Sequence, residues 1–592
     1  MILSALDWFV IAFFLMLTMG IGIYYTRKAG QNTDNFFLGG RNLPWYIAGT
    51  SMVATTFAAD TPLAVTEMVA LNGIAGNWLW WNFLAGGMLT TFFFARLWRR
   101  AEVLTDLEFI EVRYSGKPAF VLRAFRAVYY GIFMNAIIIG WVNVALISLF
   151  QVFFGLDNTT ALFYTAIAMT IVMIYSSMSG FLGVVMTDFI QFIIAMGGTI
   201  VLAFIVVNSE AVGGIAGLKA ELPAWTFSYF PNLSRQTVGG AAQALTLSIG
   251  SFLAFTTVQW WASWYPGAEP GGGGYIAQRM MSTRSEKDAV YATLFFQVAH
   301  YCVRPWPWIL VGLASLVLYP DLTAADKKLG YVMAMKDFLP SGLRGLLLVA
   351  FLSAYMSTIS TQLNWGASYI VNDLYKRVSG PETNEKTLVN VSRIATVLLM
   401  LISLGVTTQI GNISNAWGFI VECGAGLGLV MILRWYWWRI NAWSEIVATI
   451  APFMAYAFAK YYLALFDPAW GKGIQEDPRG FFLTVGFTTL AWLVATFLTQ
   501  PTHPNTLHKF YLKVEPQGYW KPVRQALKLS PQKSGLKFLF LAWFSAIVFA
   551  YSTLFLTGEI IFANWNQALI YAVLIVISIF TLRFATNRVQ IF

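Results

Sequence analysis

The chain has 592 residues, of which 58% are hydrophobic and only 11% are charged. A soluble protein of this size needs far more polar surface, so the composition excludes a soluble globular chain. The net charge of +10 is spread over many loops and forms no basic stripe, which argues against a nucleic-acid partner. We therefore expect an all-α, polytopic membrane protein.

A membrane-spanning helix needs roughly 20 predominantly apolar residues, and fifteen runs in the sequence meet this rule. The first run has no basic leader and no small-residue cleavage site, so we expect a retained helix and not a signal peptide. In chain order the predicted spans are residues 8–25, 45–71, 76–97, 119–153, 158–178, 180–207, 239–265, 289–318, 344–375, 388–410, 413–435, 441–464, 481–500, 537–557 and 560–582.

Lys and Arg concentrate in every second loop between these spans. Because basic residues stay on the cytoplasmic side of short loops, this alternation places the N-terminus outside the cell and the C-terminus in the cytoplasm. It also predicts that residues 501–536 form a basic cytoplasmic linker. We expect a multi-pass protein of the cell membrane, which in a bacterium is the inner membrane.

The second span contains the first chemical signal, a proline in mid-membrane after Asp60 and Thr61. Thr61 as N-cap and Pro62 as first helical residue would start a new half-helix. A proline kink with Asp60 hydrogen-bonded locally is the alternative. Pro and Gly also crowd residues 266–274 in or after the seventh span. Two interrupted spans five helices apart are typical of an inverted five-plus-five repeat, in which the freed backbone groups bind cations and solute.

The ninth span carries a cluster of hydroxyl groups. Helical spacing places Ser357, Ser360 and Thr361 on one face and Thr358 beside Ala354 on an adjoining stripe. Neutral oxygens suit a monovalent hard cation such as sodium. Close helix packing, or hydrogen bonds back to the preceding turn, would explain the same residues without an ion.

One carboxylate, Asp188, lies inside the otherwise apolar run 181–207. A carboxylate at membrane depth is expensive and usually serves an ion, a proton or a buried partner. Asp188 is therefore either a cation ligand or a structural carboxylate bonded to nearby hydroxyls.

Four motifs in this order, with a short fifth one, resemble the sodium/solute symporter family, which includes carriers of sugars, proline, pantothenate and sialic acid. They are DNFFLGGRNLPW at 34–45, TDLEFIEVRY at 105–114, GFLGVVMTDFIQ at 180–191, STISTQLN at 357–364 and DLY at 373–375. The resemblance covers roughly residues 5 to 440. It implies a five-plus-five inverted-repeat transporter core with broken first and sixth core helices.

The domain organisation follows from this resemblance. Residues 1–44 would hold the N-terminal helix and a cytoplasmic loop, 45–210 the first repeat and 239–437 the second. Residues 438–592 would hold accessory helices around the linker at 501–536. Those last helices are expected to stabilise the bundle, contact membrane lipid or dock an unidentified membrane partner.

The resemblance also implies the ligands of the coupling ion, Na⁺. The principal site would use backbone oxygens of Ala54, Phe57 and Ala354 with the hydroxyls of Ser357 and Thr358. A second sodium site, present in some members, would use Asp188, Ser357, Ser360 and Thr361. The implied activity is sodium-coupled uptake of a small polar organic solute by alternating access, with no enzymatic step.

The solute itself is less clearly indicated. Residues expected to line a central cavity are Thr56, Asp60, Thr61, Asn82, His300 and Arg304. Arg304 would grip a carboxylate on the solute; alternatively it pairs with Asp60 or Glu422, or extends to the membrane interface.

Two further functions stay open: a transport-like membrane sensor, and a symporter driven by protons. A membrane enzyme is disfavoured because no HExxH, GxSxG or Walker A pattern occurs.

Overall fold

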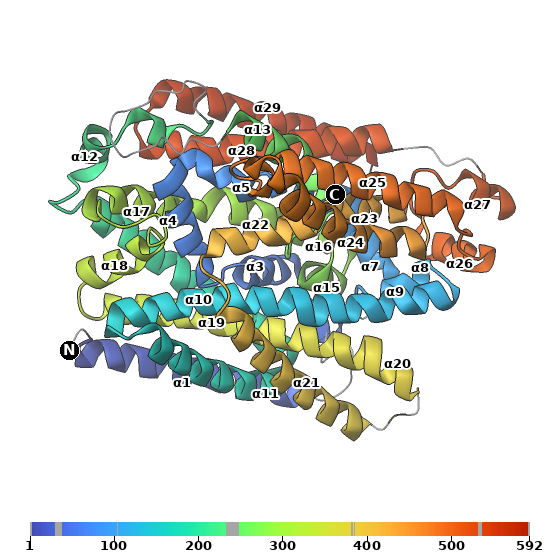
Figure 1. Cartoon of the computed structure of the whole chain (residues 1–592), viewed down its shortest axis with the longest axis horizontal. Coiled ribbons are helices and arrows are strands. Elements are labelled where there is room, and N and C mark those ends of the chain that lie inside the picture. The colour runs from blue at the N-terminus through green and yellow to red at the C-terminus, as the bar shows by residue number, and fades with distance from the viewer. Residues whose placement is uncertain are drawn as a thin grey trace.

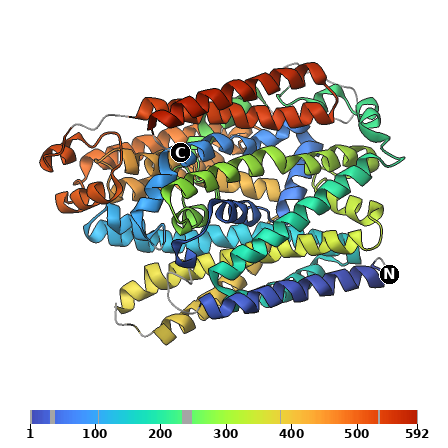
Figure 2. The ribbon, with the colours of Figure 1, turned by 180° about the vertical axis from the view of Figure 1, so that it is seen from behind.

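The computed structural model describes residues 3–29, 38–103, 105–231, 248–380, 383, 385–530 and 535–589. Within these ranges the regular structure is helical, and the long helices lie side by side along one axis (Figures 1 and 2). By length and composition, nine described helices can cross a membrane, or ten if one bent pair counts as a single span. The remaining predicted spans are present as shorter apolar helices or as helices broken into pieces.

The predicted first repeat follows the N-terminal helix α1. Its second element, α4, starts after a gap of four residues that is described with the site below. The elements are α1 (Ala5–Ala29), α3 (Trp45–Thr55), α4 (Asp60–Asn72), α5 (Trp78–Trp81), α6 (Phe83–Leu89), α7 (Ala95–Ala101), α8 (Glu108–Arg113), α9 (Gly116–Val128), α10 (Asn135–Phe154) and α11 (Asn158–Val207).

A short helix, α12 (Gly214–Glu221), leads to the predicted second repeat, whose first residues, 239–247, lie outside the described residues. Its elements are α13 (Ile249–Leu253), α14 (Trp260–Ala262), α15 (Gly274–Ser282), α16 (Glu286–Val298), α17 (Pro305–Leu318), α18 (Leu329–Phe338), α19 (Leu343–Ser368), α20 (Lys376–Ser379), α21 (Glu385–Thr407), α22 (Ile413–Cys423) and α23 (Leu427–Tyr436). The limits of the two repeats stay predictions.

The expected loop between the spans at 158–178 and 180–207 is not formed, because the backbone is helical throughout α11. Both ends of α11 lie at the same end of the molecule, beside the end of α10 and the start of α12 (Figure 1). The two predicted spans therefore correspond to two arms of one bent helical run.

The C-terminal part covers one side of this core. It comprises α24 (Ala442–Ala457), α25 (Arg479–Leu498), α26 (Pro504–Val514), α27 (Lys521–Ala526), α28 (Leu536–Ile561) and α29 (Trp565–Val589). Ring donors tie α28 to core carbonyls: Trp543 Nε1 donates to Ala85 O at 2.8 Å, and Tyr551 Oη donates to Trp81 O at 2.9 Å. These bonds fix α28 on the core, whereas α29 lies on the outside of α28 (Figure 1).

The linker helices α26 and α27 are held by a buried arginine, Arg113. Its Nε donates to Arg434 O at 2.7 Å, at the C-terminal end of α23, and its guanidinium lies over the rings of Phe510 and Trp520. A cation at a helix C-terminus is favourable because the last carbonyls have no partner in their own helix. One side chain thus joins the core to the linker.

A side chain of α1 caps the N-terminus of α19, the helix that carries the hydroxyl cluster. Asp7 Oδ1 accepts the backbone N–H groups of Gly342 at 2.8 Å and of Gly345 at 2.7 Å. These are amide groups at a helix N-terminus, which otherwise lack an acceptor.

We expect Asp7→Ala to destabilise the protein by about 1–3 kcal/mol, because it leaves buried N–H groups without an acceptor. The melting temperature of the detergent-purified protein measures this loss. Asp7→Asn keeps an oxygen at the same place and should lose far less. Equal melting temperatures for wild type and Asp7→Ala would contradict the role of Asp7 as a cap for α19.

Candidate functional site

The predicted break in the second span is confirmed between α3 and α4, at Thr56 to Ala59. The predicted start of the new half-helix is wrong. α4 begins at Asp60, and the side chain of its N-cap residue, Ala59, makes no capping bond. Thr61 N donates to Ala58 O at 3.2 Å, which starts the helix earlier. Pro62 then lies within the first turn, where a backbone N–H is not needed.

Arg304 holds the end of α3. Its Nη1 donates to Val53 O at 2.9 Å and its Nη2 to Thr56 O at 3.0 Å. The guanidinium is fully buried and lies over the Trp308 ring, 5.0 Å from its centre. Arg304 therefore supplies donors and positive charge where α3 leaves its carbonyls unpaired.

The partners expected for Arg304 are not the ones it has. Among the described residues no ion pair joins Arg304 to Asp60 or to Glu422, and Glu422 instead accepts the N–H of Ile474 at 2.9 Å. Extension to the membrane interface is also excluded by its burial. The sequence could not show this, because the carbonyls that Arg304 binds lie about 250 residues away.

The second predicted break, in the sixth core helix, is also confirmed. α14 ends at Ala262 and α15 starts at Gly274, with irregular backbone between them. At the start of α15, Gly274 N donates to Asp106 Oδ2 at 3.0 Å, and Tyr369 Oη donates to the other oxygen of Asp106. A carboxylate at this end of α15 is favoured by the helix dipole.

A third break, which the sequence analysis missed, bends α22 against α23 by 50°. It is joined to the second break, because Gly426 N donates to Ala262 O at 2.8 Å and Trp264 N donates to Gly424 O at 3.3 Å. Gly426 has a φ of +90°, and a Cβ on Gly424 would lie 2.7 Å from Trp264 backbone atoms. The run of glycines at 424, 426 and 428 was the available signal.

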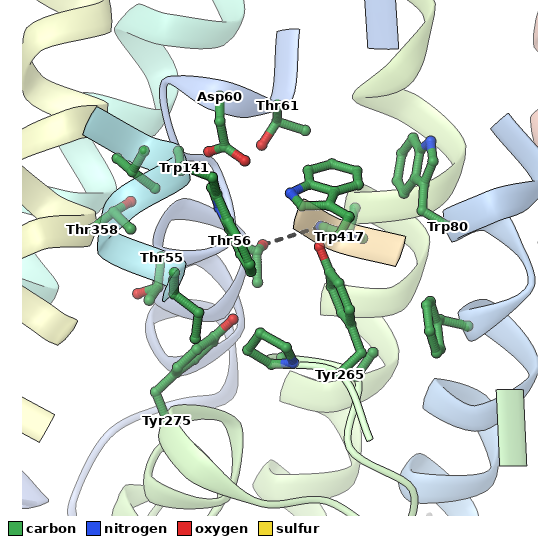
Figure 3. A pocket seen from close by; sticks show the side chains of 18 of the residues that line it. Thr55, Thr56, Asp60, Thr61, Trp80, Trp141, Tyr265, Tyr275, Thr358 and Trp417 are labelled. Atoms are coloured by element: carbon green, nitrogen blue, oxygen red, sulfur yellow. Dashed lines mark hydrogen bonds between the residues drawn. The ribbon is translucent and has the colours of Figure 1, made fainter. Parts of the chain in front are cut away.

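A cavity of about 80 Å³ lies between the first two breaks (Figure 3). It is several times the roughly 10–15 Å³ that one water needs, so it holds a small solute or several waters. Seven of its 21 lining residues are aromatic. The aromatic lining residues are Trp80, Phe83, Trp141, Tyr265, Tyr275, Tyr301 and Trp417.

Five of the six residues expected to contact solute line this cavity: Thr56, Asp60, Thr61, His300 and Arg304. Asn82 is not among the lining residues. Its amide donates to Trp78 O at 2.7 Å and to Leu79 O at 2.9 Å, back to the preceding turn. Thr358, expected to bind sodium, does line the cavity, so the hydroxyl helix and the end of α3 meet there.

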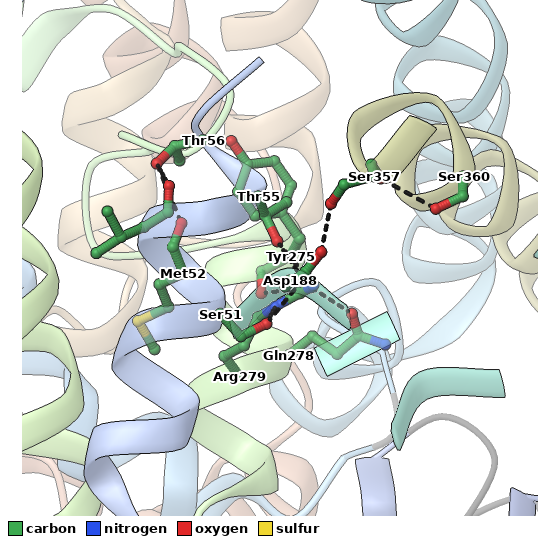
Figure 4. A network of polar contacts seen from close by, with 11 residues as sticks. Ser51, Met52, Thr55, Thr56, Asp188, Tyr275, Gln278, Arg279, Ser357 and Ser360 are labelled. Carbon is green, nitrogen blue, oxygen red and sulfur yellow. Dashed lines mark hydrogen bonds and ion pairs between the residues drawn. The ribbon is translucent and has the colours of Figure 1, made fainter. Parts of the chain in front are cut away.

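Asp188 of α11 lies at the centre of a buried polar network that joins this helix to three others (Figure 4). It accepts a hydrogen bond from Ser357 of α19, and its Oδ2 accepts from Ser51 at 3.2 Å and from Thr55 at 3.3 Å on α3. Arg279 of α15 lies 4.0 Å from the same oxygen and donates to Thr55 Oγ1 at 3.0 Å.

The sequence predicted only part of this network. Ser51, Thr55 and Arg279 were missed, although Ser51 and Thr55 are four residues apart and so share a helix face. Ser360 does not contact Asp188 directly, since its hydroxyl donates to Ser357 O at 3.0 Å.

The hydroxyl oxygens of Thr358 and Thr361 are buried and have no hydrogen-bond partner among the described residues. Threonines in a helix commonly donate back to the preceding turn, and buried polar atoms are usually paired. Both oxygens are therefore available as ligands for a small cation.

The model of the sodium:solute symporter family matches residues 36–451, well over half of the chain. The chain belongs to this family. As a sodium:solute symporter it has relatives of nearly equal length. A sodium/glucose cotransporter of Vibrio parahaemolyticus is 23% identical, over 78% of this chain and 86% of that protein. The osmoregulated proline transporter OpuE of Bacillus subtilis is 27% identical, over 83% and 94%.

A solved structure confirms the fold. A Na⁺-coupled sialic acid symporter, in a substrate-bound outward-open state, aligns with a TM-score of 0.63 at 19% identity, and covers 84% of this chain and 99% of its own. The five-plus-five inverted-repeat fold predicted from the sequence is thus confirmed. So is the function at this level: the protein is a multi-pass membrane transporter that couples the uptake of a small solute to sodium.

We expect Arg304→Lys to weaken sodium binding by more than about tenfold, because one ammonium group cannot bridge Val53 O and Thr56 O and the end of α3 loses its shape. The sodium concentration that gives half of the full rise in melting temperature measures this effect. Arg439→Lys is the matched control, since Arg439 also donates to a carbonyl at a helix end, Thr499 O at 2.8 Å, but does not line the cavity. Wild-type sodium binding in Arg304→Lys would show that sodium binding does not need the two hydrogen bonds from Arg304 to the end of α3.

Proposed function

We propose that the principal sodium ion binds where the end of α3 meets α19. Its ligands would be the backbone oxygens of Ala54, Phe57 and Ala354 and the hydroxyls of Ser357 and Thr358. The observation that carries this proposal is the unpaired, buried hydroxyl of Thr358 beside a helix end. Sodium needs few charged ligands, and carbonyls at a broken helix are a recurring source of neutral ones.

A second sodium ion would use Asp188 with Ser357, Ser360 and Thr361. The unpaired oxygen of Thr361 and the carboxylate of Asp188 support this site. Arg279 opposes it, because its guanidinium already provides a positive charge next to Asp188. The second ion thus requires Arg279 to share the carboxylate or to move from it.

Coupling follows from the position of the principal site. α3 belongs to the first repeat and α19 to the second, so an ion that bridges them stabilises the conformation in which both contribute ligands. Thr56 and Thr358 line one cavity, and the solute would bind there against Thr56, Asp60, Thr61 and His300. Ion and solute then favour the same conformation and raise each other's affinity by the same factor.

The orientation with the N-terminus outside and the C-terminus in the cytoplasm remains our proposal. It is supported by the basic linker helices, where Lys509, Lys513 and Lys521 are exposed. The apolar outer face of α29, which exposes Leu569, Val573 and Phe580, would contact membrane lipid.

Uptake into liposomes tests the function. We expect at least one of proline, glucose and sialic acid, the solutes named for the relatives, to accumulate when an inward sodium gradient is imposed. Replacement of sodium by potassium at fixed pH should abolish accumulation. Uptake that persists in potassium and follows a pH gradient would identify a proton symporter. Solute binding without accumulation would identify a sensor.

The two proposed ion sites predict different mutant behaviour. Thr358→Val has nearly the same shape but lacks the oxygen, so we expect the half-saturating sodium concentration to rise about tenfold or more, with an unchanged melting temperature in potassium. Asp188→Asn should lower the Hill coefficient of sodium activation from near two toward one, because one of the two ions is lost. It also leaves a buried guanidinium without its carboxylate, which destabilises the fold.

The double variant Asp188→Asn with Arg279→Gln separates these two effects, because it removes both charges together. If Asp188 binds sodium, stability recovers but the sodium response stays shallow. If Asp188 only balances Arg279, both stability and sodium response return to the wild-type values.

A further inference from the structure

We propose that the solute carries a positively charged nitrogen, and that Asp60 and the aromatic wall of the cavity bind it. This inference rests on the proposed function of the cavity as the solute site. It differs from the sequence-based expectation, in which Arg304 would bind a carboxylate on the solute.

Asp60 is buried and has one oxygen that is unpaired among the described residues. Its side chain is only 2% exposed, yet its Oδ1 accepts no hydrogen bond from the described residues. Asp60 lines the cavity, and Figure 3 shows its carboxylate next to Trp141 and Thr61. The carboxylate interacts with the indole N–H groups of Trp417 and Trp141 and with the positive charge of Arg304, but Oδ1 itself stays unpaired within the described ranges. A buried acceptor without a donor is costly, so a ligand that brings a charged N–H donor to this oxygen is favoured.

Aromatic side chains line the cavity together with this carboxylate. Trp417 contacts Trp141 edge to face with ring centres 6.5 Å apart, and contacts Tyr265 in the same way at 6.0 Å. Tyr265 stacks on Phe83 at 5.1 Å. Aromatic rings packed together beside a carboxylate suit an ammonium group, because ring faces attract cations and tryptophan attracts them most.

Arg304 is the other charged residue that lines the cavity. Both terminal nitrogens of its guanidinium donate to Val53 O and Thr56 O. Its planar faces lie over Trp308 and Phe57. A solute carboxylate that took these donors would remove the partners of the α3 carbonyls. The Nε–H of Arg304 has no hydrogen-bond partner among the described residues, so one donor remains for a polar group of the solute. The two terminal nitrogens balance the helix end, and the unpaired Oδ1 of Asp60 keeps its capacity for a cationic group.

A neutral solute is the competing reading of the same carboxylate, since a sugar hydroxyl can also donate to Asp60. The neutral and the charged solute differ in whether asparagine at position 60 can replace the interaction with aspartate. Asparagine still accepts a hydrogen bond from a hydroxyl, but it offers no charge to an ammonium group. Bonds between charged groups are stronger than neutral ones, so Asp60→Asn distinguishes the two solute classes.

The test uses isosteric solute pairs and the purified symporter, with sodium or potassium in the buffer. The pairs are proline with cyclopentanecarboxylate, choline with the alcohol in which carbon replaces its nitrogen, and glycine betaine with the acid made by the same replacement. Glucose is the neutral probe. We expect at least one nitrogen-containing member, and not its carbon counterpart, to raise the melting temperature in sodium. Potassium replaces sodium because an organic cation would itself be a candidate ligand.

Asp60→Asn should lower the affinity for that nitrogen-containing solute by about 10- to 100-fold. Glu67→Gln is the matched control. Glu67 lies seven residues further on α4, is also fully buried with an unpaired oxygen, and does not line the cavity. Its other oxygen accepts from Ser414 at 3.1 Å, which glutamine preserves, so solute affinity should stay at the wild-type value.

A variant at the wall keeps the test independent of the folding of Asp60→Asn. Trp417→Phe should retain part of the affinity for the charged solute and Trp417→Leu should lose most of it, while both keep the rise in melting temperature caused by sodium alone.

Three results would overturn the inference: stabilisation by glucose or the carbon members only, an Asp60→Asn affinity within about twofold of wild type, or no response to any charged-nitrogen solute. Each leaves the response to sodium alone intact. Loss of that sodium response in the wild type would instead contradict the proposed function.

Discussion

The interruption of a helix inside the membrane, between Thr55 and Asp60, is the constraint on which the rest of the site depends. Lipid offers no water to unpaired N–H and C=O groups, so every backbone group freed by the break needs a partner from the protein or from a ligand. Arg304 supplies donors to part of the α3 end. The groups that remain define where an ion and a solute can bind.

Two breaks line one cavity, and a third is bonded to one of them. The α3–α4 break and the α14–α15 break both contribute cavity residues, and the α14–α15 break is bonded to the α22–α23 break through Ala262 and Gly426. Broken helices move as half-helices. A ligand that contacts several of them therefore shifts the balance between conformations that differ in the placement of those halves.

Buried charges are balanced locally in this protein. Asp188 lies beside Arg279, with Ser51 and Thr55 between them. At the other end of the core, Glu445 is bonded to Arg126 and Tyr114. Balanced groups of this kind hold helices in register, because removal of one partner leaves an uncompensated charge. Asp60 differs from them because it lines the cavity with an oxygen that is unpaired in the described part of the chain, and on this combination we base its proposed role in binding a ligand.

The sequence alone determined the helical class, the order of the helices, the positions of two breaks and the helix that carries the hydroxyls. These are local properties: apolar length, a proline in mid-membrane, crowded glycines and the spacing of Ser and Thr along one helix. The tertiary structure decided which groups meet. The carbonyls held by Arg304 and the guanidinium beside Asp188 depend on contacts between segments far apart in the chain. The bend at Gly424 depends on its close approach to the backbone of Trp264. Hydrogen bonds between distant segments leave no periodic trace in the chain, so only the packed helices reveal them.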